Sequence, residues 1–327
     1  MKVGIPRTLF FYKFYPFWKK FFEELGFDVI ISEPTNKEIL DLSVRYAPSE
    51  ACLPVKLAYG HSWSLKNKVD ILFVPRIVSI EQKAYMCPKF LGLPDILRNS
   101  KIDLPFILDV EIDRRSDPFS SFDAFLKLGK SLVKDRRKVL HAYFSARKDL
   151  KEYERLLHEG NRLDYLIEGE KYKERNDHQT LNIGVIGHSY NIYDRFINNS
   201  LLDNLSKLGV NIYMMEEVNW NKILKEANVL PKKLFWTLGK ELYGGVRYFT
   251  NNKCIDGLIL VFAFGCGPDS LVRELIEQDL IKPGRIPTLS LVLDEHTAEV
   301  GLLTRLEAFV DMLQRRKKVE DNKPIIW

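Results

Sequence analysis

The chain has 327 residues, 46% of them hydrophobic and 28% charged, with 18 glycines and 15 prolines. This is an ordinary globular composition, and it excludes the disordered, collagen-like and low-complexity classes. The formal net charge of +5 reflects 49 basic against 44 acidic residues, an excess too small and too evenly spread to predict a nucleic acid or a membrane as a partner.

Two further features bear on where the protein acts. No apolar run approaches the roughly 18–20 residues needed to cross a bilayer, and the chain opens on a strand-like segment, residues 2–5, instead of a signal peptide. The four cysteines, at positions 52, 87, 254 and 266, are too few and too dispersed for a disulfide framework. We therefore expect a cytoplasmic protein whose cysteines are buried thiols or ligands.

Residues 1–112 alternate short apolar runs with helical stretches. The runs predict strands at residues 3–5, 29–31, 71–74 and 104–110, and the apolar spacing between them predicts helices at 16–25, 36–46 and 53–65. Gly26 is expected to end the first of these helices. Strands that alternate with helices indicate a parallel sheet covered on both faces, so this segment is predicted to be an N-terminal α/β domain.

Residues 113–180 are predicted to form a helical connector, and the polar stretch at its end, residues 168–180, is typical of a linker. Residues 181–327 then repeat the alternation, with strands predicted at 183–186, 210–213, 257–264 and 287–293 and helices at 193–208, 232–249, 268–280 and 298–316. The predicted fold is therefore α/β, with two doubly wound parallel-sheet domains joined by a helical segment. In such sheets, ligands bind beyond the carboxyl ends of the strands.

Three of the cysteines have a proline within two residues on their C-terminal side: Cys52, Cys87 and Cys266. Because proline suits the first turn of a helix, Cys52 and Cys266 are expected just before helix N-termini, where unpaired N–H groups favour an anionic sulfur. One interpretation is that the three converge between the domains and bind an iron–sulfur cluster, whose usual ligands are thiolates. The other is that all four cysteines, Cys254 included, are small buried side chains. The spacing contains no C-x-x-C motif and leaves both interpretations open.

Weak candidates for acid–base chemistry follow predicted strands. Glu295 and His296 come after the last strand, and His188 comes after the strand at 183–186. They are candidates because a histidine beside carboxylates can titrate near neutral pH. The alternatives are a helix N-terminus capped by Thr297 and a structural histidine. Charged residues that flank the cysteines are expected either to tune a bound group or to lie in solvent: Glu50, Lys56 and Lys89.

The N-terminal segment is dense in aromatic residues, with seven of them between positions 10 and 18. That is more than one helix face can bury, and exposed apolar patches of this kind usually mark interfaces. We therefore expect a homodimer, or a heterodimer with a related subunit. A site for a flavin or another aromatic cofactor is the alternative.

Seven stretches spread over the whole chain are familiar: residues 4–7 (GIPR), 51–56 (ACLPVK), 86–95 (MCPKFLGLPD), 187–194 (GHSYNIYD), 264–270 (FGCGPDS), 294–297 (DEHT) and 304–309 (TRLEAF). They resemble the 2-hydroxyacyl-CoA dehydratase subunit superfamily. Within it, they look most like the branch of stand-alone proteins related to acyl-CoA dehydratase activases, which includes the double-cubane cluster proteins.

The resemblance implies a pair of flavodoxin-like domains with a cluster site between them. The cluster would be held by Cys52, Cys87 and Cys266, as a 4Fe–4S cubane or, alternatively, as part of a double cubane. Three thiolates leave one iron without a cysteine ligand, and that position would take substrate, water or a bridging atom. The resemblance also implies an ATP-hydrolysing activator of the actin and sugar-kinase fold as partner, a small-molecule substrate and an oxygen-sensitive, anaerobic setting.

The expected function is therefore that of a dehydratase-like or reductase component. It would accept low-potential electrons from the activator and use them to reduce or dehydrate a small substrate. A non-catalytic electron-relay or cluster-carrier subunit is the main alternative. A metal-free pair of ligand-binding domains, with all cysteines in the core, is the third.

Overall fold

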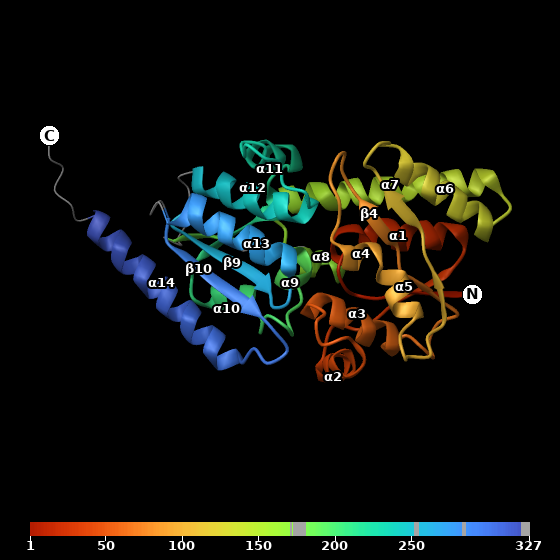
Figure 1. The fold of residues 1–327 in the computed structure, drawn as a ribbon, viewed down its shortest axis with the longest axis horizontal. Coiled ribbons are helices and arrows are strands. Elements are labelled where there is room, and N and C mark those ends of the chain that lie inside the picture. Colours follow the sequence, from red (N-terminus) through yellow and green to blue (C-terminus); the bar gives the residue numbers. More distant parts are fainter. Residues whose placement is uncertain (171, 173–180, 252–254, 283–285, 322–327) are drawn as a thin grey trace.

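The computed structural model describes residues 1–170, 172, 181–251, 255–282 and 286–321, with residues 320 and 321 described by their backbone alone. It is an α/β protein with parallel sheets, as the sequence predicts (Figure 1). Its strands are β1 (Lys2–Ile5), β2 (Asp28–Ile31), β3 (Ile71–Phe73), β4 (Arg76–Ser79), β5 (Phe106–Leu108), β6 (Glu111–Asp113), β7 (Asn182–Gly187), β8 (Asn211–Met214), β9 (Gly257–Ala263) and β10 (Thr288–Leu293).

Helices connect and cover these strands. They are α1 (Phe11–Leu25), α2 (Lys37–Tyr46), α3 (Leu53–Ser64), α4 (Pro88–Leu91), α5 (Leu93–Arg98), α6 (Ser120–Leu132), α7 (Arg136–His158), α8 (Leu163–Ile167), α9 (Ser189–Ile192), α10 (Leu201–Lys207), α11 (Trp220–Ala227), α12 (Thr237–Asn251), α13 (Gly267–Ile276) and α14 (Glu299–Asp321), with a short 3-10 turn η1 (Met215–Glu217) and a π turn η2 (Glu277–Ile281).

The two larger sheets share one strand order. The first runs β2-β1-β3-β5 and the second β8-β7-β9-β10, and neighbouring strands within each are parallel. In the first sheet Val3 pairs with Val29 on one side and Ile71 on the other, and in the second Ile183 pairs with Ile212 and Gly257. Both orders correspond to the first four strands of a flavodoxin-like sheet. In each sheet the strand order therefore reverses beside the first strand, and this reversal is where ligands bind in such folds.

Strand β9 shows how the second sheet is covered on both faces. All of its residues are buried, and successive side chains point to opposite faces. Ile259 and Val261 pack in a cluster with α10 and α14, whereas Leu258, Leu260 and Phe262 pack in a separate cluster with α11, α12 and α13. The strand therefore reads as an unbroken apolar run, which is why it was predictable from the sequence.

Helix α1 begins at Phe11, five residues before the predicted start at Pro16, so the proline lies inside the helix. A proline cannot donate to the carbonyl four residues earlier, which here belongs to Tyr12. The hydroxyl of Tyr153, on α7, donates a 3.0 Å hydrogen bond to that carbonyl. At its other end α1 stops at Gly26, as expected, whose φ of 89° is left-handed and favours glycine.

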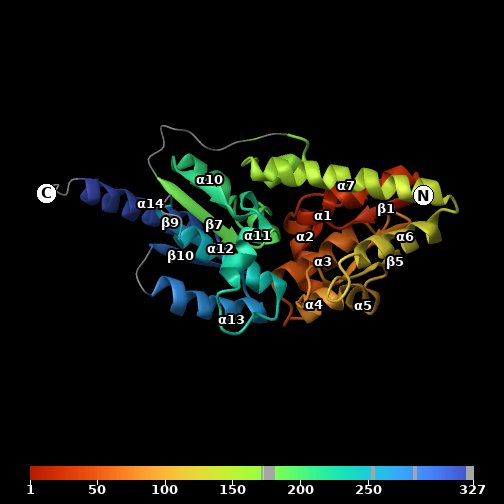
Figure 2. The same ribbon diagram turned by 90° about the horizontal axis from the view of Figure 1, so that it is seen from above.

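The connector helices pack against the first sheet instead of lying between two separate cores. Figure 2 shows α7 running along α1. One cluster of buried side chains extends from Val3 through α7 to Leu313 on α14, so it includes residues of both sheets. The division into domains at residues 112 and 180 therefore stays a prediction, and most of the predicted linker, 168–180, lies outside the described residues.

Two predicted helices differ from the structure. The helix expected at 193–208 is much shorter in the structure, since within this range only α10 is helical and Asn199 and Ser200 just before it have left-handed φ angles of 51° and 54°. The helix expected at 232–249 starts only at Thr237, and α11 precedes it as a separate helix. The small parallel sheet of β4 and β6 was also missed, because strands of three or four residues leave little periodicity to read.

The aromatic segment is more buried than the sequence suggests. Five of its seven aromatic side chains are buried: Phe10, Phe11, Tyr12, Phe17 and Trp18. The expectation of an exposed aromatic patch in this segment is wrong, because α1 is covered on several sides and not on one face alone. Phe17, for example, stacks edge-on against Phe125 of α6 and Tyr143 of α7. The aromatic density is therefore no argument for a dimer.

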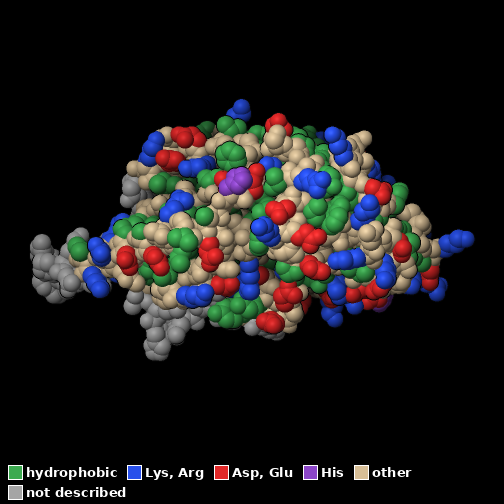
Figure 3. Space-filling model, turned by 90° about the horizontal axis from the view of Figure 1, so that it is seen from below, with side chains coloured by type: hydrophobic (Ala, Val, Ile, Leu, Met, Phe, Trp, Pro, Cys, Tyr) green, Lys and Arg blue, Asp and Glu red, His purple; other side chains and the backbone are tan. Residues whose placement is uncertain are grey.

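The surface carries mixed charge. Figure 3 shows basic and acidic side chains interspersed over one face, as the small net charge leads one to expect. Within the part of the chain that the structure describes, no helix is both long and apolar enough to cross a membrane.

Candidate functional site

The three cysteines followed by proline occupy equivalent positions at the starts of three helices. Cys52 immediately precedes α3, Cys87 precedes α4 and Cys266 precedes α13, and each has an extended backbone conformation with a proline at the first or second helical position. Local sequence explains this, because proline is preorganised for the first turn of a helix. Each sulfur therefore lies at the positive end of a helix dipole.

Cys52 and Cys266 are brought together although they are distant in sequence. Gly265 has a left-handed φ of 77° at the turn from β9 into α13, and a Cβ at this position would lie 3.5 Å from the Cα of Cys52. Cys52 is buried, and Cys87 and Cys266 are partly buried. Figure 1 shows α3, α4, α9 and α13 meeting between the two larger sheets. Cys254 lies outside the described residues.

The thiols are electrostatically coupled. A hydrogen bond from the Cys266 thiol lowers the pKa of Cys52 to about 7, against the opposing effect of burial. The same bond, together with burial, raises the pKa of Cys266. Burial raises the pKa of Cys87, and the nearby charge of Cys52 adds to that effect. Of the two thiols, Cys52 is therefore the more acidic.

Backbone N–H groups also favour anionic sulfur at all three positions. Smaller contributions that lower the pKa come from the N–H of Val55 at Cys52, of Phe90 at Cys87 and of Asp269 at Cys266, in each case three residues after the cysteine. These N–H groups belong to the first turn of each helix, and those of Val55 and Phe90 also donate to the backbone carbonyl of the cysteine itself, at 2.9 and 3.0 Å. The site is therefore suited to hold negative charge on sulfur.

The thiols are not arranged around a single metal ion. Among the described residues, no group of three or more His, Cys, Asp or Glu side chains has the geometry to hold one. A cubane cluster is larger than an ion and occupies the space between its ligands, so it requires thiolates that stand apart. The hydrogen-bonded Cys52 and Cys266 would have to separate to admit one.

His188 belongs to the same region and forms a buried pair. Its Nε2 lies 2.9 Å from Oδ1 of Asp269, in the first turn of α13, and both side chains are at least 96% buried. Burial alone would lower the pKa of His188, but the Asp269 carboxylate outweighs it and the pKa is raised. Nδ1 of His188 and Oδ2 of Asp269 have no hydrogen-bond partner among the described residues.

Tyr190 shows how close the cysteines are to this pair. Its ring lies 5.1 Å from that of His188 and 6.2 Å from that of Phe90, on the Cys87 helix. Burial raises its pKa well above the usual value, and the charges of Asp269 and of all three cysteines raise it further. His188 therefore lies one aromatic ring away from the thiol site.

The other two acid–base candidates are placed differently. The Glu295 carboxylate accepts a 2.8 Å hydrogen bond from Lys56, on the Cys52 helix, and this bond lowers its pKa. The side chain of His296 is exposed. Thr297 donates its hydroxyl to the Asp294 side chain, so it closes a turn before α14 and caps no helical N–H.

The charged residues that flank the cysteines are fixed by specific contacts. Lys56 is held by Glu295, and the ammonium of Lys89 donates a 2.7 Å hydrogen bond to the backbone carbonyl of Glu50. The charge of Lys89 contributes to lowering the pKa of Cys52, after the larger effect of the Cys266 bond. These contacts tie the loop of Cys52 to that of Cys87.

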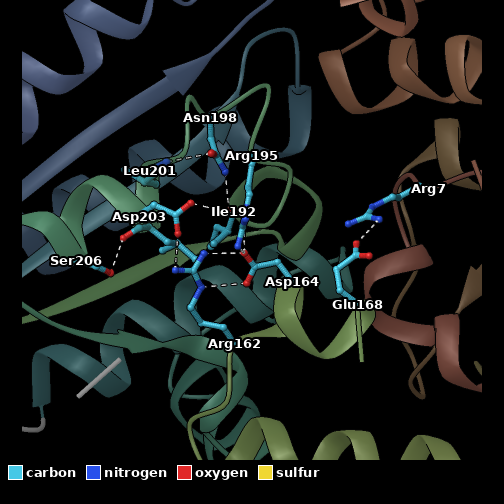
Figure 4. Close-up of polar contacts among 11 residues, drawn as sticks. Arg7, Arg162, Asp164, Glu168, Ile192, Arg195, Asn198, Leu201, Asp203 and Ser206 are labelled. Carbon is cyan, nitrogen blue, oxygen red and sulfur yellow. Dashed lines mark hydrogen bonds and ion pairs between the residues drawn. The ribbon is translucent and has the colours of Figure 1, made fainter. Parts of the chain in front are cut away.

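A second polar cluster was missed by sequence reasoning. Figure 4 shows Arg162 paired through two nitrogens with Asp164, while Asp203 and Arg195 complete the network. The network joins the connector helix α8 to α10, through Asp203, and to Arg195 in the segment before α10. Arg7, from the first sheet, reaches Glu168 at 2.8 Å.

Beside this cluster lies a polar cavity of about 360 Å³ lined in part by Arg7, Thr35 and Asp194. The hydroxyl of Thr35 donates to Asp194 and also contacts Nε2 of the buried His61 at 3.0 Å. Arg7 and Asp194 end the motifs GIPR and GHSYNIYD, so their presence in those stretches was the available signal. Their convergence depends on the tertiary fold and was not readable from spacing.

Comparison with protein families gives one match. Residues 2–218, about two thirds of the chain, match the model described as CoA enzyme activase uncharacterised domain. The matched region contains Cys52, Cys87 and His188, while Cys266, Glu295 and His296 lie beyond it. Among curated proteins, no match is found. The chain therefore belongs to the family of the CoA enzyme activase uncharacterised domain, which relates it to the acyl-CoA dehydratase system.

Proposed function

We propose that this protein is an iron–sulfur component of a dehydratase-like or reductase system, with Cys52, Cys87 and Cys266 as the ligands of a 4Fe–4S cluster. The carrying observation is that three cysteines from distant parts of the chain begin three helices around one site, with N–H groups that favour thiolate at each. Iron–sulfur clusters are held by thiolates, and their potential depends on the charges and N–H groups near the sulfurs.

The residues present fit such a group in their chemistry and surroundings once Cys52 and Cys266 separate, and they supply three of its four usual thiolates. When bound, the cluster would accept and pass on single electrons and offer one iron without a cysteine ligand. The chain's own contribution would be to shield the site with Tyr190 and Phe90 and to hold it through the ion pair of Lys56 with Glu295. The double-cubane arrangement and the ATP-hydrolysing activator remain parts of this proposal that rest on the family relationship.

The buried pair of His188 and Asp269 favours catalysis over simple electron relay. A relay needs no proton donor beside its cluster, whereas reduction or dehydration of a substrate moves protons as well as electrons. His188 has an unpartnered Nδ1 beside the thiol site and a carboxylate that orients its ring. In this proposal His188 exchanges a proton with the substrate and Asp269 fixes the ring.

The proposal is tested by spectroscopy and turnover on protein purified without oxygen. Wild-type protein should have a broad visible absorption that an activator and ATP bleach, and that activator without ATP does not. His188→Ala should keep the absorption and its ATP-dependent bleaching while losing turnover on any substrate that the wild type converts.

Two results would argue against the proposal. Colourless protein that stays folded and takes up no iron and sulfide would show that the three cysteines hold no cluster. Equal turnover by wild type and His188→Ala would leave the cluster and the catalytic class but show that His188 does not exchange the proton with the substrate.

A further inference from the structure

One cavity in the described part of the molecule lies away from the cysteines. It is an open groove of about 1060 Å³, bounded by α1, α6, α7 and the residues around β4 and β6 (Figure 1). The aromatic side chains at its base pack against one another: Phe17 against Phe125 at 4.7 Å and Phe122 against Tyr143 at 4.8 Å between ring centroids. The base is therefore a rigid apolar surface formed before any ligand arrives.

Aromatic side chains also stand exposed at the groove. Phe119 and Phe144, both among its lining residues, are 71% and 61% exposed. Side chains of this size are rarely left in water next to an open apolar surface unless something covers them. This marks the groove as a surface for contact.

The walls of the groove are cationic. Arg147, Lys148 and Lys151 line it from α7. They follow Phe144 at helical spacing and so form one stripe beside the buried face of that helix. In the described part of the chain none of the three has an ion-pair partner.

The opposite wall adds Arg114, next to β6. The Nε of Arg114 is buried and has no hydrogen-bond acceptor among the described residues. Two acidic residues also line the groove, Asp149 and Glu152. Glu152 accepts a 2.9 Å hydrogen bond from Arg155. Arg114, Arg147, Lys148 and Lys151 then stand against Asp149 alone, so the net charge of the remaining lining residues is positive.

We propose that this groove binds an acidic amphipathic helix of a partner protein. A helix laid in a groove presents apolar side chains at every third or fourth position to the floor, and acidic residues beside them would meet the α7 stripe and Arg114. The stripe from residue 144 to residue 151 spans about 10 Å, the length of about two helical turns. The positive walls select against basic partners. The proposal is independent of the cluster.

The test uses the full chain and two fluorescently labelled peptides of about 18 residues. Both peptides carry the same Leu and Phe face, and their polar faces carry Glu in one and Lys in the other. By fluorescence anisotropy, the Glu peptide should bind wild-type protein at least about tenfold more tightly than the Lys peptide. The double variant Arg147→Glu with Lys151→Glu should lose that preference.

A matched control keeps the result specific to the groove. Lys127 and Lys130 are exposed on α6 and do not line the groove, so Lys127→Glu with Lys130→Glu changes the net charge equally and should bind the Glu peptide as the wild type does. Phe119→Ser should weaken binding without a change of charge.

Three outcomes would overturn the proposal. One is no binding of the Glu peptide at about 100 µM, and another is equal loss of binding in the control variant. The third is a wild-type dimer in sedimentation that Arg147→Glu with Lys151→Glu converts to monomer, because the groove would then be covered by a second copy of this chain.

Discussion

Gly265, which precedes Cys266 at the start of α13, lies against Cys52 at the start of α3, so that a Cβ on the glycine would lie 3.5 Å from the Cα of Cys52. The contact depends on two loops that meet between the larger sheets, one of them turning at Gly265. It brings two thiols, each at the start of a helix, close enough to affect each other's pKa. It places the chemical interest of the molecule where the carboxyl ends of the strands converge.

His61 gives the clearest pH prediction. Burial lowers its pKa to about 3, whereas an unfolded histidine titrates near 6.5. Between these values the unfolded chain binds a proton that the folded chain does not. The free energy of unfolding should therefore fall as the pH falls through this window, by up to about 1.4 kcal/mol per pH unit from this residue.

The matched variant is His61→Gln, which can still bridge the hydroxyls of Ser32 and Thr35 that contact the two ring nitrogens. Urea unfolding between about pH 7 and about pH 5 should show a shallower loss of stability in the variant than in the wild type. The same slope in both proteins would mean that His61 titrates normally when folded.

The carbonyl left free by Pro16 predicts an effect of Tyr153. Replacing Tyr153 by Phe removes the hydroxyl that donates to Tyr12 and leaves a buried acceptor without a partner, at a cost of about 1–3 kcal/mol in the free energy of unfolding. Tyr143→Phe on the same helix is the control and should cost less. In a Pro16→Ala background, residue 16 regains an N–H for that carbonyl, so Tyr153→Phe should cost less than in the wild type.

The ion pair of Lys56 and Glu295 predicts non-additive losses. The two side chains are 9% and 18% exposed, so either single change, Lys56→Met or Glu295→Leu, leaves a largely buried charge unpaired and should cost about 2–4 kcal/mol. The double variant should cost less than the sum of the two. Additive losses in chemical unfolding would mean that the pair contributes nothing as a pair.

The sequence was most informative where local rules dominate. The apolar runs at β7 and β9 and the glycine at position 26 predicted elements that the structure contains, because burial on both faces and a left-handed turn leave direct traces in composition. The helix expected at 193–208 was wrong for an equally local reason. The Asp194 carboxylate accepts hydrogen bonds from the backbone N–H of Phe196 and Ile197, as a helix N-cap would, but the left-handed φ angles of Asn199 and Ser200 interrupt the chain before α10.

The site was only partly predictable. Proline after Cys52, Cys87 and Cys266 predicted helix starts at two of these positions, and the structure shows a helix start at all three. The pairing of His188 with Asp269 and the cavity beside Asp194 depend on how two sheets and α8 pack together, and no spacing in the chain encodes that. The burial of the aromatic segment was missed for the same reason.

The measurement that tests the central claim most directly is the content of iron and acid-labile sulfide per chain, on protein purified without oxygen. The account predicts about four of each for one cubane, a loss of both in Cys266→Ala and no loss in Cys254→Ala, whose cysteine lacks a following proline. Equal loss in the two variants, or wild-type protein that is folded and free of iron, would contradict it.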